Sequence, residues 1–242
     1  MFYPADATEL RRTVEDYLAE ASPDEGASPK AIIAPHAGYI YSGPIAASAY
    51  ACIRPTGITR VVLLGPAHRV YLDGLAASSA LAWRTPLGDV RVAAPEGIPI
   101  LDPAHAEEHS LEVQLPFLQV VLDDFTLIPL VVGQATPREV AAVLESLWGG
   151  PETLIVISSD LSHYESYETA NRMDTAATEA ILNLDPDALG SGSACGRIPI
   201  GGLLRLAKQK GLRAELLDLR NSGDTAGPHD QVVGYGAYGF YE

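Results

Sequence analysis

Four short apolar runs divide the chain, and segments with helical periodicity lie between them. The runs read KAIIAP (30–35), RVVLLGP (60–66), TLIPLVV (126–132) and TLIVISS (153–159). Each is too short and too rich in β-branched residues for a helix, so each predicts a strand buried on both faces. Strands that alternate with helices predict a layered α/β fold, with a central, mostly parallel or mixed sheet covered by helices.

The remaining patterns complete this arrangement without dividing the chain. No linker, repeat or low-complexity tract interrupts the 242 residues, so we expect a single domain over 1–242. We expect disorder only in short segments such as ASPDEGASPK (21–30). The expected helices cover 7–20, 44–53, 103–122, 137–148, 167–184 and 199–211, and the further strands cover 74–80, 88–94, 214–219 and 231–241, with a hairpin turn at 84–89.

The charge of the chain excludes two classes of partner. The formal net charge is −15, and the acidic residues are spread along the sequence. No basic patch is available for phosphate backbones or anionic lipids, so we expect neither nucleic acid nor a membrane as partner. The sequence shows no secretory leader and no apolar run of about 18 to 20 residues, which makes a cytoplasmic location the expectation.

Polar side chains follow the ends of three predicted strands. His36 follows the first run and His68 the second, while Asp160 and His163 follow the run at 153–159. In open α/β sheets the ligand crevice lies beyond the carboxyl ends of the strands, so parallel neighbours would bring these four side chains together. In the alternative interpretation each is a loop residue with a local hydrogen bond. In a metal site, Asp160 would fix the tautomer of a ligating histidine, or Asp160 and His163 would form an acid/base pair beside the metal. In the simpler alternative, Asp160 caps the turn that follows its strand.

Two cysteines are too few for a disulfide framework, and one of them suits a metal site. Histidines combined with one cysteine favour zinc, copper or iron, whereas magnesium or calcium would require oxygen ligands. Cys195 is the predicted thiolate, because glycines surround it and both Arg197 and the start of the next helix would lower its pKa. Cys52 lies in an apolar, small-residue helix, so we expect it to be a core residue.

The segment EHSLEVQLPFL adds two candidate residues. His109 and Glu112 are three positions apart and share a helical face, and the apolar neighbours would bury that face. A competing pattern, HAEEH, matches the H-x-x-E-H motif of inverted zinc peptidases, with His105 and His109 as ligands and Glu108 as base. If that pattern has no function, His105 is a surface residue at a helix start.

Six separated motifs resemble the Memo family, whose prokaryotic members are called AmmeMemoRadiSam system protein B. They read PHAGYIYSGPIAASAY, LLGPAHRV, EHSLEVQLPFL, SSDLSHY, CGRIPIGGLL and VVGYGAYGFY, in the family's order from about residue 30 to the end. The resemblance implies a fold akin to the class III extradiol non-haem iron dioxygenases. It also implies metal ligands at His36, His68 and Cys195, with Asp160 and His163 lining the same pocket.

We therefore interpret the chain as a metal-binding, oxygenase-like redox enzyme that uses one iron or copper ion, with zinc as an alternative. The candidate catalytic residues are Asp160, His163, His109 and Glu112. A thiolate would stand where the dioxygenases have a carboxylate, so ring cleavage does not carry over. The alternatives are a non-catalytic binding or adaptor protein that keeps the metal cleft, and a zinc-type metal-dependent hydrolase. We expect a small-molecule substrate or a peptide ligand, and the family name implies AMMECR1-type and radical-SAM partner proteins.

Overall fold

The computed structural model describes residues 2–21 and 26–242. Residues 22–25, within the segment expected to be disordered, lie outside the described residues. The strands are β1 (Ala31–Ala34), β2 (Arg60–Pro66), β3 (Leu75–Ala77), β4 (Ala82–Thr85), β5 (Gly88–Val92), β6 (Thr126–Val132), β7 (Thr153–Ser158), β8 (His163–Glu165), β9 (Arg213–Asn221) and β10 (Val232–Tyr241). The helices are α1 (Ala7–Glu20), α2 (Tyr39–Tyr50), α3 (Asp102–Ala106), α4 (His109–Glu112), α5 (Leu115–Val121), α6 (Pro137–Leu147), α7 (Tyr167–Leu182) and α8 (Arg197–Lys210).

Five neighbouring strands run parallel and form the centre of a mixed sheet. Its order is β4-β5-β6-β2-β7-β1-β10-β8, with β3 paired to β6 and β9 paired to β10. The strands from β5 to β1 are parallel, whereas β10 is antiparallel to β1. The predicted α/β fold with a mixed sheet is therefore confirmed. Because β1, β2 and β7 are parallel neighbours, the loops that follow them meet at one edge of the sheet.

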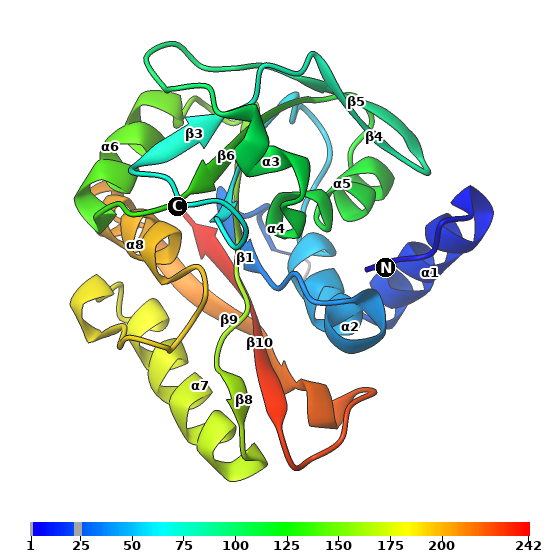
Figure 1. Cartoon of the computed structure of the whole chain (residues 1–242), viewed down its shortest axis with the longest axis vertical. Helices are drawn as coiled ribbons and strands as arrows, with labels where there is room; N and C mark the ends of the chain where they lie inside the picture. The colour runs from blue at the N-terminus through cyan, green and yellow to red at the C-terminus, as the bar shows by residue number, and fades with distance from the viewer. Residues whose placement is uncertain (1, 22–25) are drawn as a thin grey trace.

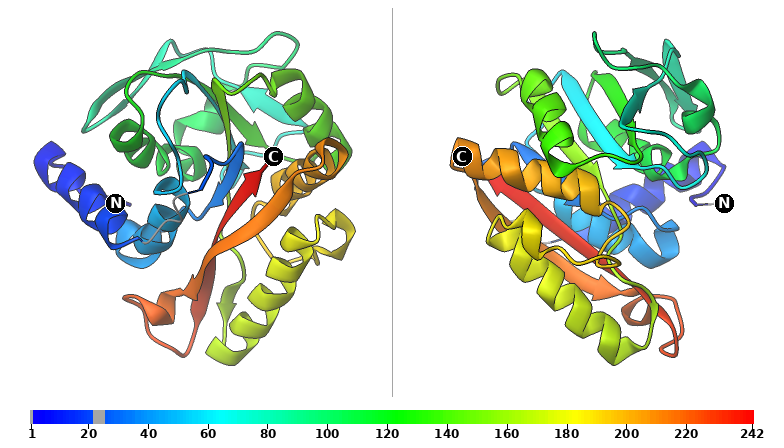
Figure 2. Two further views of the ribbon diagram at one scale, coloured as in Figure 1. Left: turned by 180° about the vertical axis from the view of Figure 1, so that it is seen from behind. Right: turned by 60° about the vertical axis from the view of Figure 1, so that its left-hand side comes forward.

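Helices cover both faces of this sheet (Figure 1). Helices α1, α2 and α5 lie on one face, where Leu10 and Ile45 belong to one apolar cluster. Helices α6, α7 and α8 lie on the other face, where Val140 and Leu204 belong to a second cluster, and Figure 2 shows the two layers from behind and from the side. Strand β7 is buried along its whole length, as an apolar strand covered on both faces should be. In the described part of the chain, no helix has the length and apolar character needed to cross a bilayer.

The hairpin prediction is correct in its turn and wrong in one of its strands. The turn joins β4 to β5, and β4 is antiparallel to β5, with Ala82 opposite Arg91. The run at 74–80 contributes instead the short strand β3, which pairs with β6. All three residues of β3 are buried, whereas two of the four residues of β4 are exposed and only one is buried. The sequence of β4 accordingly lacks an apolar pattern.

The single helix expected over 103–122 is divided into three short helices. Helix α4 starts after Glu108, whose side chain accepts a hydrogen bond from the Ser110 backbone N–H as its N-terminal cap. Helix α5 starts with Pro116 in its first turn, a position that proline favours because its missing N–H is not needed there. These breaks turn the segment back toward the end of β2, and they place His109 at the carboxyl edge of the sheet.

Candidate metal centre

Three histidines from separate segments meet at the carboxyl edge of the sheet. His36 follows β1, His68 follows β2, and His109 begins α4. Their ligand atoms all lie within 4.8 Å of one another. The ring centroids are 5.3 Å apart for His36 and His68, 5.5 Å for His36 and His109, and 4.8 Å for His68 and His109. The parallel arrangement of β1 and β2, on either side of β7, brings His36 and His68 together as the sequence predicted.

The hydrogen bonds of Ser158 determine which nitrogen of His36 is available. The Ser158 hydroxyl donates to the Ser110 carbonyl, so it must accept from the His36 Nδ1–H, 2.9 Å away. Gln114 Nε2 donates to the same hydroxyl at 2.8 Å and completes its bonds. The Nε2 atom of His36 is therefore unprotonated, and its lone pair is available for a metal ion. Burial lowers the pKa of His36 to about 4, so the ring is neutral and able to bind a metal at neutral pH.

Glu108 fixes His68 in the same tautomer. Its carboxylate accepts hydrogen bonds from His68 Nδ1 at 2.9 Å and from the His68 backbone N–H at 2.6 Å. Burial alone would raise the pKa of Glu108, but the hydrogen bonds from His68 and Ser110 outweigh burial and lower it to about 2. A carboxylate that holds the Nδ1–H of a histidine leaves Nε2 free for a metal and increases its basicity.

His109 stacks between two rings and has a buried nitrogen without a hydrogen-bond partner. Phe2 lies parallel to its ring at 4.4 Å between centroids, and His68 lies on its other side. His109 Nδ1 makes no hydrogen bond among the described residues, and its separation from Glu108 Oε1 is 3.5 Å. Burial, followed by the electrostatic effect of the neighbouring His68, lowers the pKa of His109. A buried nitrogen without a hydrogen-bond partner, within a cluster of three imidazoles, fits a site for a metal ion and its ligand.

Cys195 and Asp160 lie on the His36 side of the cluster. Cys195 Sγ is 3.4 Å from His36 Nε2 and accepts a hydrogen bond from the Asp160 backbone N–H at 3.3 Å. The Asp160 carboxylate accepts from the His36 backbone N–H at 2.7 Å, and its other oxygen is 4.0 Å from His36 Nε2. Asp160 therefore holds the loops of His36 and Cys195 together.

The expected lowering of the Cys195 pKa is wrong for the metal-free protein. Burial, followed by the negative charge of Asp160, raises the pKa of Cys195 to about 12. Helix α8 begins at Arg197, two residues before its expected start. The start of this helix and the charge of Arg197 should both lower the pKa of the thiol, but burial outweighs them. The thiol is therefore protonated without a metal, and a bound cation would be needed to hold it as thiolate.

The other candidate residues lie farther from the cluster. His163 is in β8, where its Nδ1 donates to the Leu161 carbonyl at 2.8 Å, and no hydrogen bond or ring contact within residues 2–21 and 26–242 joins it to the three histidines. Glu112 accepts a hydrogen bond from the Tyr3 hydroxyl at 2.5 Å. Glu112 and His109 line one cavity of about 370 Å³, together with Phe2. The predicted shared face of His109 and Glu112 thus opens into a cavity beside the cluster.

The H-x-x-E-H pattern does not form a metal site. His105 Nε2 is 3.2 Å from the Ala76 carbonyl, and its ring lies against Trp83. His105 is half-buried, and its expected surface position is also wrong. Glu108, the base in that pattern, instead binds His68. The sequence patterns did not indicate that Glu108 is the hydrogen-bond partner of His68, although the position of Glu108 directly before His109 is evident in the sequence.

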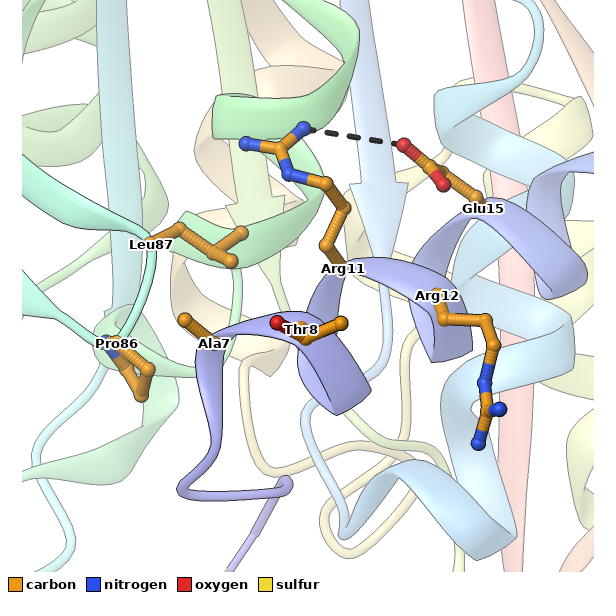
Figure 3. A pocket seen from close by; sticks show the side chains of 7 residues that line it. All are labelled: Ala7, Thr8, Arg11, Arg12, Glu15, Pro86 and Leu87. Carbon is orange, nitrogen blue, oxygen red and sulfur yellow. Dashed lines mark ion pairs between the residues drawn. The ribbon is translucent and has the colours of Figure 1, made fainter.

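A cavity on another part of the surface lies between α1 and the β4–β5 turn, and neither a histidine nor a cysteine lines it (Figure 3). It has a volume of about 330 Å³, and Pro86 and Leu87 form one wall. Arg11 is paired with Glu15 at 3.8 Å, and Figure 3 shows Arg12 pointing away from Leu87. The charged groups are thus paired or turned outward, and the histidine cluster is the better candidate site.

Comparison with known proteins agrees with the motifs. A family model described as Memo-like protein matches residues 1–238. MEMO1 family proteins from Ignicoccus hospitalis and Desulfurococcus amylolyticus are 38% and 37% identical, over 99% of this chain and 95% and 96% of their own length. A MEMO1 family protein from Methanopyrus kandleri is 36% identical over 99% of this chain and 95% of its own.

Among solved structures, the uncharacterized protein JW3007 from Escherichia coli is similar with a TM-score of 0.48 and 10% identity, covering 86% of this chain and 99% of that one. The match to the family model extends over nearly the whole chain, and the relatives match it over nearly their whole length. The chain therefore belongs to the Memo family.

Proposed function

We propose that the protein binds one iron or copper ion at this centre and is an oxygenase-like redox enzyme that acts on a small molecule. The supporting observation is the cluster itself, in which His36, His68 and His109 offer ligand atoms within 4.8 Å at the carboxyl edge of the sheet. His36 and His68 have their Nδ1 atoms occupied and their Nε2 atoms free, which is the arrangement of metal-binding histidines.

We assign Cys195 as the third ligand. A nitrogen and a sulfur bound at a tetrahedral angle, with bonds of about 2.0 and 2.3 Å, lie about 3.5 Å apart. The separation of His36 Nε2 and Cys195 Sγ is 3.4 Å, close to that value. Imidazole with thiolate suits iron or copper, and three protein ligands leave positions for a substrate. When bound, the ion would supply electron transfer and polarise oxygen atoms of the substrate.

The protein groups around the ion have separate tasks in this proposal. Asp160 keeps the His36 and Cys195 loops at a fixed separation. Glu108 and Ser158 hold the two histidine rings in the ligand tautomer. His109 is neutral at pH 7 and lines the 370 Å³ cavity, so it is placed to accept a proton from a substrate hydroxyl group.

A zinc-dependent hydrolase is the second candidate, and one observation favours it. The group of donors within 4.8 Å consists of three histidines and does not include Cys195. Three histidines with one open position form a catalytic zinc site that activates water. Under this alternative His109 is a ligand, and Cys195 is a neighbouring thiol.

One experiment distinguishes the two candidates. The wild-type chain, Cys195→Ala and His109→Ala are purified without oxygen, and their metal content is measured by mass spectrometry. The redox proposal predicts iron or copper in the wild type, its loss in Cys195→Ala, and its retention in His109→Ala. Zinc that is lost from His109→Ala and retained in Cys195→Ala would support the hydrolase. A metal-loaded protein that binds ligands without turning them over would support the adaptor interpretation.

A further inference from the structure

A second cavity borders the histidine cluster on the side of His68. It has a volume of about 150 Å³ and lies between the loop that follows β2 and the loop that follows β6. His68 and Arg69 line it from the first loop, and Gly133 and Gln134 line it from the second. Because drug-sized ligands occupy roughly 300 Å³ or more, this cavity suits one polar group of a ligand that extends over His68.

Arg69 brings an uncompensated positive charge to this cavity. The chain has 31 acidic and 16 basic residues, and six of its other arginines form ion pairs. Arg69 is exposed and makes no ion pair or hydrogen bond within the described ranges. In so acidic a chain, an arginine beside the candidate metal ligands without a carboxylate partner is available for an anion from solution.

The two cavities beside the cluster differ in charge. None of the residues lining the Arg69 cavity is acidic, and the nearby Asp73 accepts a hydrogen bond from Tyr71 at 2.8 Å. The cavity on the other side of the cluster contains Glu107 and Glu112. The electrostatic field therefore favours an anionic group on the Arg69 side.

We infer that Arg69 binds the anionic group of the substrate, so that the substrate class is a small organic acid, a carboxylate or a phosphate. This inference rests on the proposed function, because it gives a substrate to the same centre. The planar guanidinium binds either group through two parallel N–H···O bonds. The remainder of the molecule then extends from Arg69 across His68 toward the open side of the cluster, and Arg69 acts as a specificity-determining residue.

The test uses benzoate and benzamide, which have nearly the same size and differ in charge. Each is titrated into ¹⁵N-labelled protein, metal-free and zinc-loaded, and the side-chain resonances of Arg69 and Gln134 are followed. We expect benzoate to bind at least tenfold more tightly than benzamide in both forms. Arg69→Ala should weaken benzoate at least tenfold and leave benzamide unchanged, while Arg69→Lys keeps part of the preference. Arg12→Ala, the same charge change at an exposed position of α1, should have no effect.

Acetate and inorganic phosphate, titrated in the same way, separate the two kinds of anion. Preference for either one supports the inference and names the group. Equal affinity of Arg69→Ala and wild type for benzoate would overturn it, and so would an equal loss in Arg12→Ala. Because the metal-free form is included, the affinity of Arg69 for anions can be determined even if the protein binds no metal. Conversely, a failure of anion binding leaves the separately measured metal content intact.

Discussion

The replacement of Glu108 by glutamine tests the hydrogen bonding that prepares His68 for a metal. The carboxylate accepts from His68 Nδ1, from the His68 backbone N–H and from the Ser110 backbone N–H, at 2.9, 2.6 and 2.9 Å. Glutamine has the same shape but only one acceptor oxygen. With that oxygen toward His68 Nδ1 and Ser110, its NH₂ group faces the His68 backbone N–H, so that two donors oppose each other.

The expected losses follow from these contacts. Removing a carboxylate partner of a metal-binding histidine weakens metal affinity about 10- to 100-fold, which corresponds to about 1.4 to 2.7 kcal/mol. The unsatisfied buried N–H lowers the free energy of unfolding of the metal-free protein by about 1 to 3 kcal/mol. The ring of His68 also loses its charged partner, so part of the population changes to the other tautomer.

The assay is a competition titration of zinc against a chromophoric chelator, with ¹⁵N NMR of the His68 ring as a second readout. Glu107→Gln is the matched control, because it removes the same charge one residue away from an exposed side chain. We expect Glu107→Gln to bind zinc like the wild type and to keep the His68 tautomer. Wild-type affinity and an unchanged His68 tautomer in Glu108→Gln would show that Glu108 does not prepare His68 for a metal, and an equal loss in both variants would show the same.

Three further outcomes are expected. In the metal-free protein, burial lowers the pKa of His36 to about 4, from a value near 6.5 in the unfolded chain. The neutral His36 ring therefore contributes up to about 3 kcal/mol to the free energy of unfolding above pH 6.5, and this contribution is lost as the pH falls toward 4. Denaturant titrations should show that the free energy of unfolding falls over this pH range in the wild type, and His36→Gln should lack this part of the fall. A Cβ on Gly196 would lie 2.6 Å from Ser159 Cβ, so Gly196→Ala should lower the free energy of unfolding by about 1 to 3 kcal/mol and reduce the amount of bound metal. Gly190→Ala is the control, because there is open space at its Cβ, and it should change neither the stability nor the metal content. His105→Ala should leave the metal content unchanged, and a loss would revive the peptidase pattern.

The sequence was sufficient to predict the central parallel strands β1, β2, β6 and β7 and two of the clustered histidines, but it did not predict β4 or β8. Apolar runs that end in His36 and His68 are local signals, and the parallel order of such strands follows from the α/β alternation. The link between Glu108 and His68 was not predictable in this way, because it depends on breaks in the segment 103–122 that continuous helical periodicity concealed. Those breaks arise from a side-chain cap and a proline, and only tertiary contacts determine where the intervening residues lie.

The protonation of Cys195 illustrates a second limit. Glycines, a helix start and Arg197 are all visible in sequence and all favour a thiolate. Burial raises the pKa of Cys195, and the nearby charge of Asp160 adds to this effect, so that together they exceed the local influences. The position of Asp160 beside Cys195 follows from the packing of two distant loops. Local sequence shows the charges near a residue, whereas the removal of water around it is a property of the whole fold.

Under the proposed function, one redox-active ion is bound by His36, His68 and Cys195. X-ray absorption at the metal edge of protein purified without oxygen tests it most directly, because one spectrum identifies the element and its ligand atoms. We expect an iron or copper edge, with nitrogen scatterers at about 2.0 to 2.1 Å and one sulfur at about 2.3 Å that is absent in Cys195→Ala. A zinc edge with nitrogen scatterers and no sulfur would contradict the proposed redox centre.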